Sequence, residues 1–408
     1  MKHKTFFLIL FSLTTTLFAS PRYDAIGDID FSPYSGGEDL LTLHHFLMER
    51  EDLLLKRPPF SKSWSHRTAR LLDLIAWDIV DTYLMIFQHE VFGHGYRIRD
   101  LGDNYAKVRK YKFSWFGAAT EFTVTDQMSS SLMTTIAIGG VEATAILANR
   151  TRLKWLQTGQ MDGRQAVLYT RSQQDLTNYI LSMQDCFIEP SLDGHDIRTY
   201  LFFLNLTYDG NLTDDTLKKR VLMNYLDPFT FFSYYSWFKY IFSGKPFSFP
   251  MIPIGSYRYL PSVRMGLTPF GPEYYLENFL VKDREPIYFY LKWGRYTKNS
   301  YFGLGLEQPS LFTWKGCLIG YRFDAWRQPP ILFDFKSLED FDESTNTDLP
   351  ENLHKQRLGV AFSVVLEKEI KDSGFFLYIQ PGFKTQGFLP GESLRAAPII
   401  RAGFSLNF

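Results

Sequence analysis

The sequence is poor in cysteine and carries no net charge. Only two cysteines, Cys186 and Cys317, occur among 408 residues. Two thiols are too few for a disulfide framework or for a zinc site built from four thiolates. The 44 basic side chains are balanced by 44 acidic ones. Because nucleic-acid-binding proteins present a basic surface, this balance argues against nucleic acid as a partner.

The amino terminus has the pattern of an export signal. Basic residues in 1–4 precede a mainly apolar stretch, 5–18, which is too short to span a bilayer. Small residues follow at Ala19 and Ser20. The sequence therefore predicts a signal peptide over 1–19 and an exported mature protein.

Aromatic residues are abundant, at 17% of the chain. Tyrosine and tryptophan favour the boundary between water and lipid, so this content fits a protein whose surface is partly lipid-facing.

Helical periodicity dominates the first part of the chain. From Ser63 to Ile98, apolar residues recur at helical spacing, although Asp73, Asp78 and Asp81 argue against a membrane span there. A strand or a hairpin is expected over 113–125. Further helices are expected over 38–55, 130–147, 174–186, 194–206 and 214–242. These elements predict a mainly α-helical domain over 20–250, which ends in a proline-containing linker, 244–261.

Alternation with a period of two takes over after the linker. In the last segment, Ile400, Ala402, Phe404, Leu406 and Phe408 alternate with polar or small residues. This pattern places one face of a strand against lipid and the other in a lumen. Similar runs lie over 263–269, 274–281, 285–295, 301–308, 317–325, 357–367 and 375–387. We therefore expect an eight-stranded antiparallel transmembrane β-barrel over 255–408.

Turn lengths and the last residue support this expectation. The short turn 369–374 and the long acidic stretch 328–356 fall on opposite sides of such a barrel. The closing Phe-Ser-Leu-Asn-Phe resembles the carboxyl-terminal signature of outer-membrane proteins. The resemblance implies an outer-membrane location, lipid contact and a periplasmic helical domain. A soluble β-sandwich is the alternative.

The sharpest local pattern is His89-Glu90-Val91-Phe92-Gly93-His94. Two histidines four residues apart on a helix, with a glutamate after the first, form a common catalytic zinc motif. Here the spacing is five, which rotates the second imidazole by about 140° in a regular helix. A π-type bulge at Gly93 returns both rings to one face. The pattern predicts a zinc site on a locally widened helix.

The six residues resemble the HExxGH zinc motif of the dipeptidyl peptidase III family of metallopeptidases. This resemblance implies that His89 and His94 bind Zn²⁺ and that Glu90 activates a water. The family takes its third ligand from a glutamate on a later helix, and the matching candidate is Glu142. An isolated acid in an apolar helix also needs a cation when buried. The alternative is an ion pair with Arg97, Arg99 or Arg150.

Weaker candidates lie at the start of the helix expected over 194–206. His195 or Tyr200 would stabilise an oxyanion opposite the metal. Asp196 would hold a ligand imidazole in place. The alternatives are a helix N-cap for Asp196 and a core position for Tyr200.

The combined expectation is a two-part α+β protein, in which a zincin-like helical domain precedes the barrel. Its predicted function is that of a membrane-anchored zinc metallopeptidase acting on a peptide or protein. The first alternative is a non-catalytic envelope protein with a stabilising metal site. The second is a surface antigen that uses the 328–356 loop. The sequence does not indicate an oligomeric state.

Overall fold

A computed structural model describes residues 22–55, 64–114, 117–183, 194–333, 353–371 and 373–407. The expected signal peptide, Cys186 and most of the expected 328–356 loop lie outside these residues.

The first part of the described chain is mainly helical. It begins with strand β1 (Arg22–Asp28) and ends with helix α9 (Pro228–Ser243). Between them lie α1 (Pro33–Leu55), α2 (Trp64–His89), the π-helix η2 (Glu90–His94), α3 (Gly95–Leu101), β2 (Ala106–Ser114), β3 (Gly117–Val124), α4 (Ser130–Thr158), α5 (Gly163–Gln173), α6 (Asp175–Leu181), α7 (Asp196–Tyr208), α8 (Asp214–Val221) and the 3-10 helix η3 (Leu222–Leu226).

The second part is a run of antiparallel strands. They are β4 (Ile252–Ile254), β5 (Tyr257–Thr268), β6 (Gly271–Lys282), β7 (Glu285–Tyr296), β8 (Asn299–Trp314), β9 (Cys317–Gln328), β10 (Arg357–Glu369), β11 (Phe375–Lys384) and β12 (Ala397–Asn407). The change from helix to strand therefore falls close to the expected boundary. All eight strands predicted from the alternation are present, as β5 to β12.

The expected closed, eight-stranded barrel is wrong. Two further strands extend the sheet, because β1 pairs with β12 and β4 pairs with β5. The result is one ten-stranded sheet in the order β1-β12-β11-β10-β9-β8-β7-β6-β5-β4, which is open between β1 and β4. Both strands escaped prediction because β1 mixes charged and apolar residues and β4 has only three residues, one of them proline.

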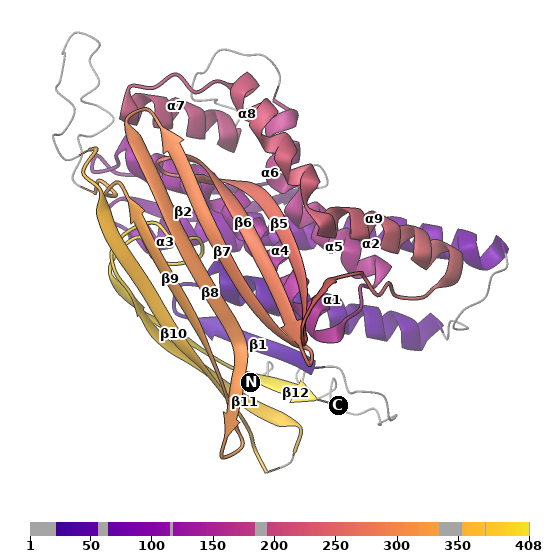
Figure 1. Cartoon of the computed structure of the whole chain (residues 1–408). Helices are drawn as coiled ribbons and strands as arrows, with labels where there is room; N and C mark the ends of the chain where they lie inside the picture. Colours follow the sequence, from indigo (N-terminus) through magenta and orange to yellow (C-terminus); the bar gives the residue numbers. More distant parts are fainter. Residues whose placement is uncertain are drawn as a thin grey trace, which may run out of the picture.

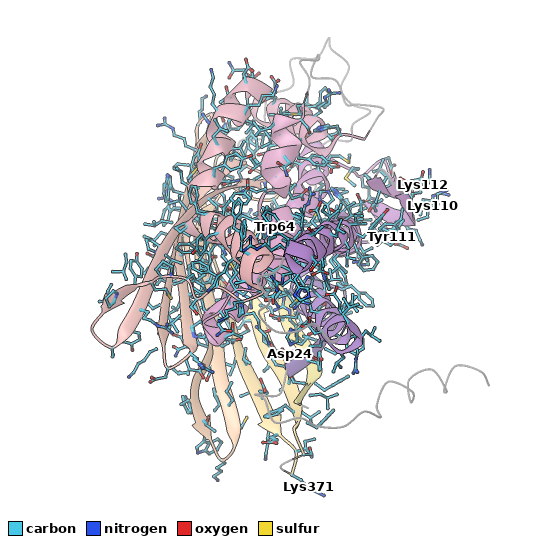
Figure 2. All side chains as sticks on the ribbon, turned by 90° about the vertical axis from the view of Figure 1, so that its right-hand side faces the viewer. Asp24, Trp64, Lys110, Tyr111, Lys112 and Lys371 are labelled. Carbon is cyan, nitrogen blue, oxygen red and sulfur yellow. The ribbon has the colours of Figure 1, made fainter. Side chains whose placement is uncertain are left out.

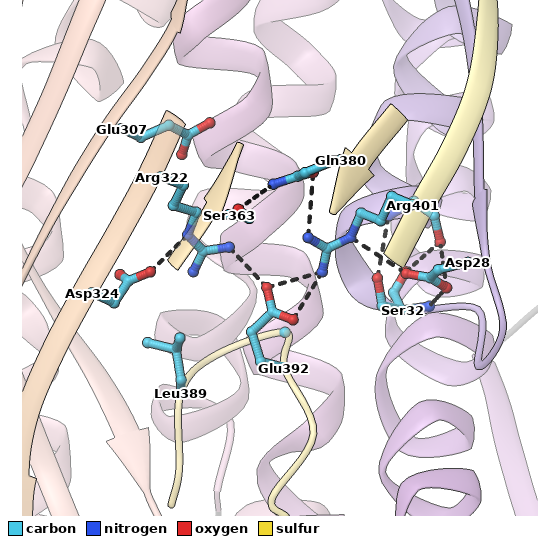
Figure 3. Close-up of polar contacts among 12 residues, drawn as sticks. Asp28, Ser32, Glu307, Arg322, Asp324, Ser363, Gln380, Leu389, Glu392 and Arg401 are labelled. Atoms are coloured by element: carbon cyan, nitrogen blue, oxygen red, sulfur yellow. Dashed lines mark hydrogen bonds and ion pairs between the residues drawn. The ribbon is translucent and has the colours of Figure 1, made fainter. Parts of the chain in front are cut away.

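The two faces of the sheet differ in polarity, as the alternation predicted. Leu291, Trp293, Phe302 and Leu358 are exposed on the outer face. The face toward the helices carries buried charges, which pair with one another. Figure 3 shows the guanidinium groups of Arg322 and Arg401 on either side of Glu392, with Asp324 and Asp28 completing the network.

Helix α4 packs against the hollow side of the curved sheet (Figure 1). Ser129 caps its first turn by accepting a hydrogen bond from the Leu132 amide, and Gly159 ends it with a left-handed backbone. By length and composition α4 is apolar enough to cross a membrane, but 89% of its most apolar window is buried within the protein. Ion pairs join α4 to the strands, from Arg150 to Glu307 and from Arg152 to Glu277. Charged residues therefore hold the helical part inside the sheet.

The expected helix over 214–242 is interrupted. Pro228 begins a new helix, α9, whose N-cap Asp227 accepts a hydrogen bond from the Phe229 amide. The stretch 113–125, expected to be a strand or a hairpin, contains the end of β2 and all of β3, and the hairpin that they form begins earlier, at Ala106. Figure 2 shows Lys110, Tyr111 and Lys112 projecting from β2 at the margin of the molecule.

Candidate metal centre

The predicted widening of the motif helix is confirmed. After α2 ends at His89, residues Glu90–His94 form one π-helical turn, and the Gly95 amide donates to the Glu90 carbonyl five residues earlier. The extra residue returns the second imidazole to the face of the first. The Nε2 atoms of His89 and His94 therefore lie 3.1 Å apart.

Glycines allow the motif helix to approach α4 closely. A Cβ atom on Gly93 would lie 2.6 Å from the Gly139 carbonyl oxygen, and one on Gly140 would lie 2.1 Å from Nε2 of His89. Neither contact is tolerated, so any side chain at these positions displaces the helices or the imidazole. The motif helix and α4 therefore meet through glycines on both sides, Gly93 on the one and Gly139 and Gly140 on the other.

Asp196 is the third member of the group. It is the first residue of α7, and its Oδ2 atom lies 3.2 Å from Nε2 of His89 and 3.1 Å from Nε2 of His94. The three side chains together form a group that can hold a metal ion. Both histidine side chains are 7% exposed and that of Asp196 is 19% exposed, so the group opens to solvent on the Asp196 side.

Hydrogen bonds fix the protonation of both imidazoles. Nδ1 of His94 lies 2.7 Å from the Ile136 carbonyl oxygen, which can only accept, so this nitrogen carries a proton. Nδ1 of His89 lies 2.9 Å from Oδ2 of Asp175, on α6. Thr144 donates to the same oxygen at 2.8 Å. In the neutral rings, both Nε2 atoms therefore present lone pairs to each other.

Three electron-pair donors thus converge, and either a metal ion or a proton on one imidazole relieves their repulsion. Ligands of a tetrahedral zinc ion, at about 2.0–2.1 Å from the metal, lie about 3.3–3.4 Å apart, close to the spacing of these three atoms. Without a metal, burial opposes charging of His89, but Asp175 and Asp196 outweigh it and raise the imidazole pKa. Burial likewise opposes ionisation of Asp196, yet the two histidines hold its pKa below the usual range.

The structure does not bring Glu142 into this group. Its carboxylate accepts hydrogen bonds from Nε and Nη2 of Arg97, and also from the Gly391 amide. Of the three arginines considered as alternative partners for Glu142, Arg97 is the one in contact. Burial raises the pKa of Glu142, although Arg97 opposes that shift. The buried acid has its cation, and the cation is a guanidinium.

The other expected site residues, Glu90, His195 and Tyr200, lie in three different environments. Glu90 is buried beside the histidines, where its Oε2 accepts a hydrogen bond of 2.6 Å from Thr120 on β3. The ring of His195 lies 4.9 Å from that of Tyr179. Tyr200 is fully buried and donates to the Thr268 carbonyl at 3.1 Å, in the core beneath the strands. The core alternative therefore describes Tyr200.

Tyr179 was not anticipated from the sequence. It lies one helical turn after Asp175 on α6, and its ring is 5.7 Å from that of His89. Burial and its hydrogen bond to Asp196 both raise its pKa, so the phenol keeps its proton. The N-cap of α7 is His195 rather than Asp196, which leaves the Asp196 carboxylate available to the histidines.

Comparisons with protein-family models, with curated proteins and with solved structures found no match to this chain.

Proposed function

We propose that the protein is a zinc-dependent hydrolase, with a peptide or protein as its substrate. The observation that carries this proposal is the convergence of His89, His94 and Asp196 with both Nδ1 atoms committed elsewhere. Two imidazoles and one carboxylate are a common ligand set for catalytic zinc, which keeps a fourth position open. Zinc bound there acidifies a water and polarises a substrate carbonyl.

The protein's own residues supply the remaining chemistry. Glu90 follows the first ligand directly, and Thr120 orients its carboxylate through Oε2. In this proposal Glu90 accepts the proton of the attacking water, as the motif resemblance implies. Tyr179 keeps its phenolic proton and contacts the ring of His89. It takes the oxyanion-stabilising role first expected of Tyr200, and His195 beside it is the second candidate for that role.

We also propose that the outer face of the sheet lies against lipid, in an outer membrane. Exposed apolar side chains on that face contrast with buried ion pairs on the other, which is the polarity of membrane strands rather than of soluble ones. The eight strands β5 to β12 contain 10 to 16 residues each, and about 9–11 residues suffice for a tilted membrane strand. Flotation of the full chain with phospholipid vesicles tests this placement, since a chain that stays in the aqueous fraction contradicts it.

The hydrolase proposal is tested with Glu90→Gln in the zinc-loaded full chain. We expect casein hydrolysis to fall by about 100-fold or more, because general-base catalysis contributes about 10²–10⁴-fold. Zinc content is expected to stay at that of the unaltered chain. Glu121→Gln on the neighbouring hairpin is the matched control, because the side chain of Glu121 is 40% exposed and pairs with Lys110 and Lys112.

A stabilising metal site in a non-catalytic envelope protein is the second candidate. The low exposure of both histidine side chains favours it, since a structural ion needs no access for substrate. In that case Glu90→Gln changes no hydrolysis, whereas removal of zinc lowers the melting temperature. Loss of hydrolysis with zinc retained excludes this candidate.

A further inference from the structure

Helix α2 has the opposite polarity from a helix of a soluble protein. Its exposed side chains form an apolar stripe, and its buried face carries charged and polar groups. The stripe comprises Leu71, Leu72, Ile75, Ile79, Val80 and Phe87. The buried polar residues are partnered: Asp73 accepts from the Tyr240 hydroxyl, Asp81 lies 3.0 Å from His44, and Gln88 donates to two carbonyls. A helix with this polarity is stable where its outer surface is not in water.

Helix α9 repeats this polarity beside α2. Its exposed residues Phe231, Tyr235, Phe238 and Phe242 are aromatic, whereas its buried face carries the small polar Ser233 and Ser236, among others. Figure 1 shows both helices on the side of the helical part that faces away from β8 to β11. The two helices contact each other there through Asp73 and Tyr240.

A groove of about 520 Å³ lies between α2, α5 and α9. This volume is within the usual range of about 300–1,000 Å³ for small-molecule sites. Its walls are mainly apolar, and include Leu71, Leu74, Ile75, Val167, Trp237 and Ile241. Polar residues also line it: Arg171 pairs with Asp78, and Gln174 and Asn178 contribute amides. The groove thus offers an amphiphile both an apolar wall and polar groups.

Two polar atoms of groove-lining residues are unsatisfied within the described part of the chain. Gln174 is 3% exposed, and its Oε1 atom accepts no hydrogen bond. Nε1 of Trp237 is also buried and donates to no atom. An unpaired buried polar atom costs about 1–3 kcal/mol, so a water or a ligand at each of these atoms stabilises the protein. A ligand with both a hydrogen-bond donor and an acceptor next to its apolar chain, such as an amide, supplies them.

The polar residues of the groove adjoin the candidate metal centre along the chain. Gln174 directly precedes Asp175, which bonds the imidazole of His89. Asn178 directly precedes Tyr179, whose ring contacts that of the same histidine. A head group held by Gln174 or Asn178 therefore lies beside α6, and Asp175 and Tyr179 occupy the neighbouring face of that helix, about 100° around its axis.

We propose that this groove binds the acyl chain of an acylated substrate and directs its amide head group toward His89, His94 and Asp196. Binding of the acyl chain is inferred from the groove alone. The role of that acyl chain as part of a substrate rests on the proposed hydrolase function.

Acyl binding is tested by quenching the fluorescence of Trp237 with dibromostearic acid, using the full chain in detergent. Bromine quenches only at short range, so we expect saturable quenching that Trp237→Phe removes. Ile75→Gln is expected to weaken the apparent affinity by about tenfold, because it makes one groove wall polar. Ile79→Gln is the matched control: it lies one turn further along the stripe, is equally exposed, and does not line the groove. Its affinity is expected to change by less than about twofold.

Two further measurements separate the groove from the catalytic proposal. In His94→Ala, which lacks a metal ligand, quenching is expected to be unchanged. In the zinc-loaded chain, an N-acylated peptide is expected to be hydrolysed faster than the same peptide without its acyl chain, and Ile75→Gln is expected to remove this difference. The acyl site is overturned if quenching does not saturate, or if both isoleucine variants lose the same affinity. It is also overturned if only an apolar helical peptide displaces the fatty acid. Equal hydrolysis of both peptides overturns the role of the groove in binding a substrate. Saturable quenching without any hydrolysis contradicts the enzyme and leaves the acyl site standing.

Discussion

Two buried polar clusters lie against α4, and their charges are balanced in different ways. Glu142 contacts Arg97, whose guanidinium is completely buried and bonds the carboxylate through two nitrogens. The other cluster, His89, His94 and Asp196, lies where Gly140 approaches the first histidine. It contains electron-pair donors and, within the described residues, no arginine or lysine that pairs with them. The first cluster contains its own cation, and the second can hold a metal ion.

The difference shows why burial alone does not identify a metal ligand. A buried carboxylate needs a positive partner, and a guanidinium with fixed donor geometry meets that need as well as a metal does. What distinguishes the candidate metal centre is the second nitrogen of each histidine. Both Nδ1 atoms bond to acceptors, the Asp175 carboxylate and the Ile136 carbonyl, and this turns both Nε2 lone pairs inward.

The largest expected effect follows from removing a ligand of the open cluster. His94→Ala leaves two of the three atoms that converge, so we expect zinc affinity to fall by about 1,000-fold or more, beyond the range for supporting residues. Competition with a chromogenic chelator, using the full chain in detergent, measures this loss. If His94→Ala binds zinc as tightly as the unaltered chain, the three-residue site is wrong.

Breaking the Glu142–Arg97 ion pair is expected to lower stability rather than zinc affinity. Glu142→Gln leaves the buried charge of Arg97 with only the more distant carboxylate of Asp100, at 3.6 Å, and removal of one partner of a buried pair costs about 3–5 kcal/mol. We therefore expect a large loss in the free energy of unfolding, with zinc affinity unchanged. Denaturant unfolding monitored by circular dichroism measures the first quantity, and chelator competition the second. A variant that loses zinc but not stability returns Glu142 to the ligand set.

Most of the sheet was predictable because strand alternation is a local property. The eight runs from 263 to 408 each show which face is apolar, and each is a strand. Whether the sheet closes into a barrel was not predictable, because closure depends on what packs against the concave face of the sheet. Arg150 and Arg152 of α4 occupy it and pair with strand glutamates, and β1 takes the edge of β12.

At the candidate metal centre, the spacing within the motif could be predicted from the sequence, whereas contacts between residues distant in the chain could not. The five-residue interval between His89 and His94 required a π-turn with glycine, and the structure has one. Asp196 was considered as a support for an imidazole, but its approach to both rings depends on how α7 packs. Nothing in the sequence around Asp175 or Tyr179 distinguishes them from surface residues of α6, because their roles arise from tertiary contacts.

A smaller effect is expected from the residue that orients the first ligand. Asp175→Asn keeps a side chain of the same shape but removes the charge that holds Nδ1–H of His89. Loss of such a supporting residue lowers metal affinity by about 10–100-fold, and we expect a value in that range from chelator competition. Thr144→Val is the matched control, because it removes one donor to Asp175 and keeps the carboxylate. Equal affinities in Asp175→Asn and the unaltered chain would show that the Asp175 contact does not support a metal.

The smallest effect is expected at Asp39 of α1, a partly buried acid to which no arginine is paired among the described residues. Burial, with nearby Glu38, Asp28 and Asp24, raises its pKa from 3.8 to about 6, although the Ile26 amide donates to it. Below pH 3.8 the folded and unfolded states are both protonated, so the raised pKa has no effect on stability. As the pH rises toward 6 the unfolded state ionises first, so the free energy of unfolding falls until Asp39 is ionised in the folded state as well.

Asp39→Asn removes this loss of stability and keeps an oxygen for the Ile26 amide. We therefore expect the free energy of unfolding to rise by about 1–2 kcal/mol at pH 7.5 and to be unchanged at pH 3.5. Denaturant titrations of both chains at the two pH values measure the difference, and an equal gain at both would mean that the effect is not one of charge.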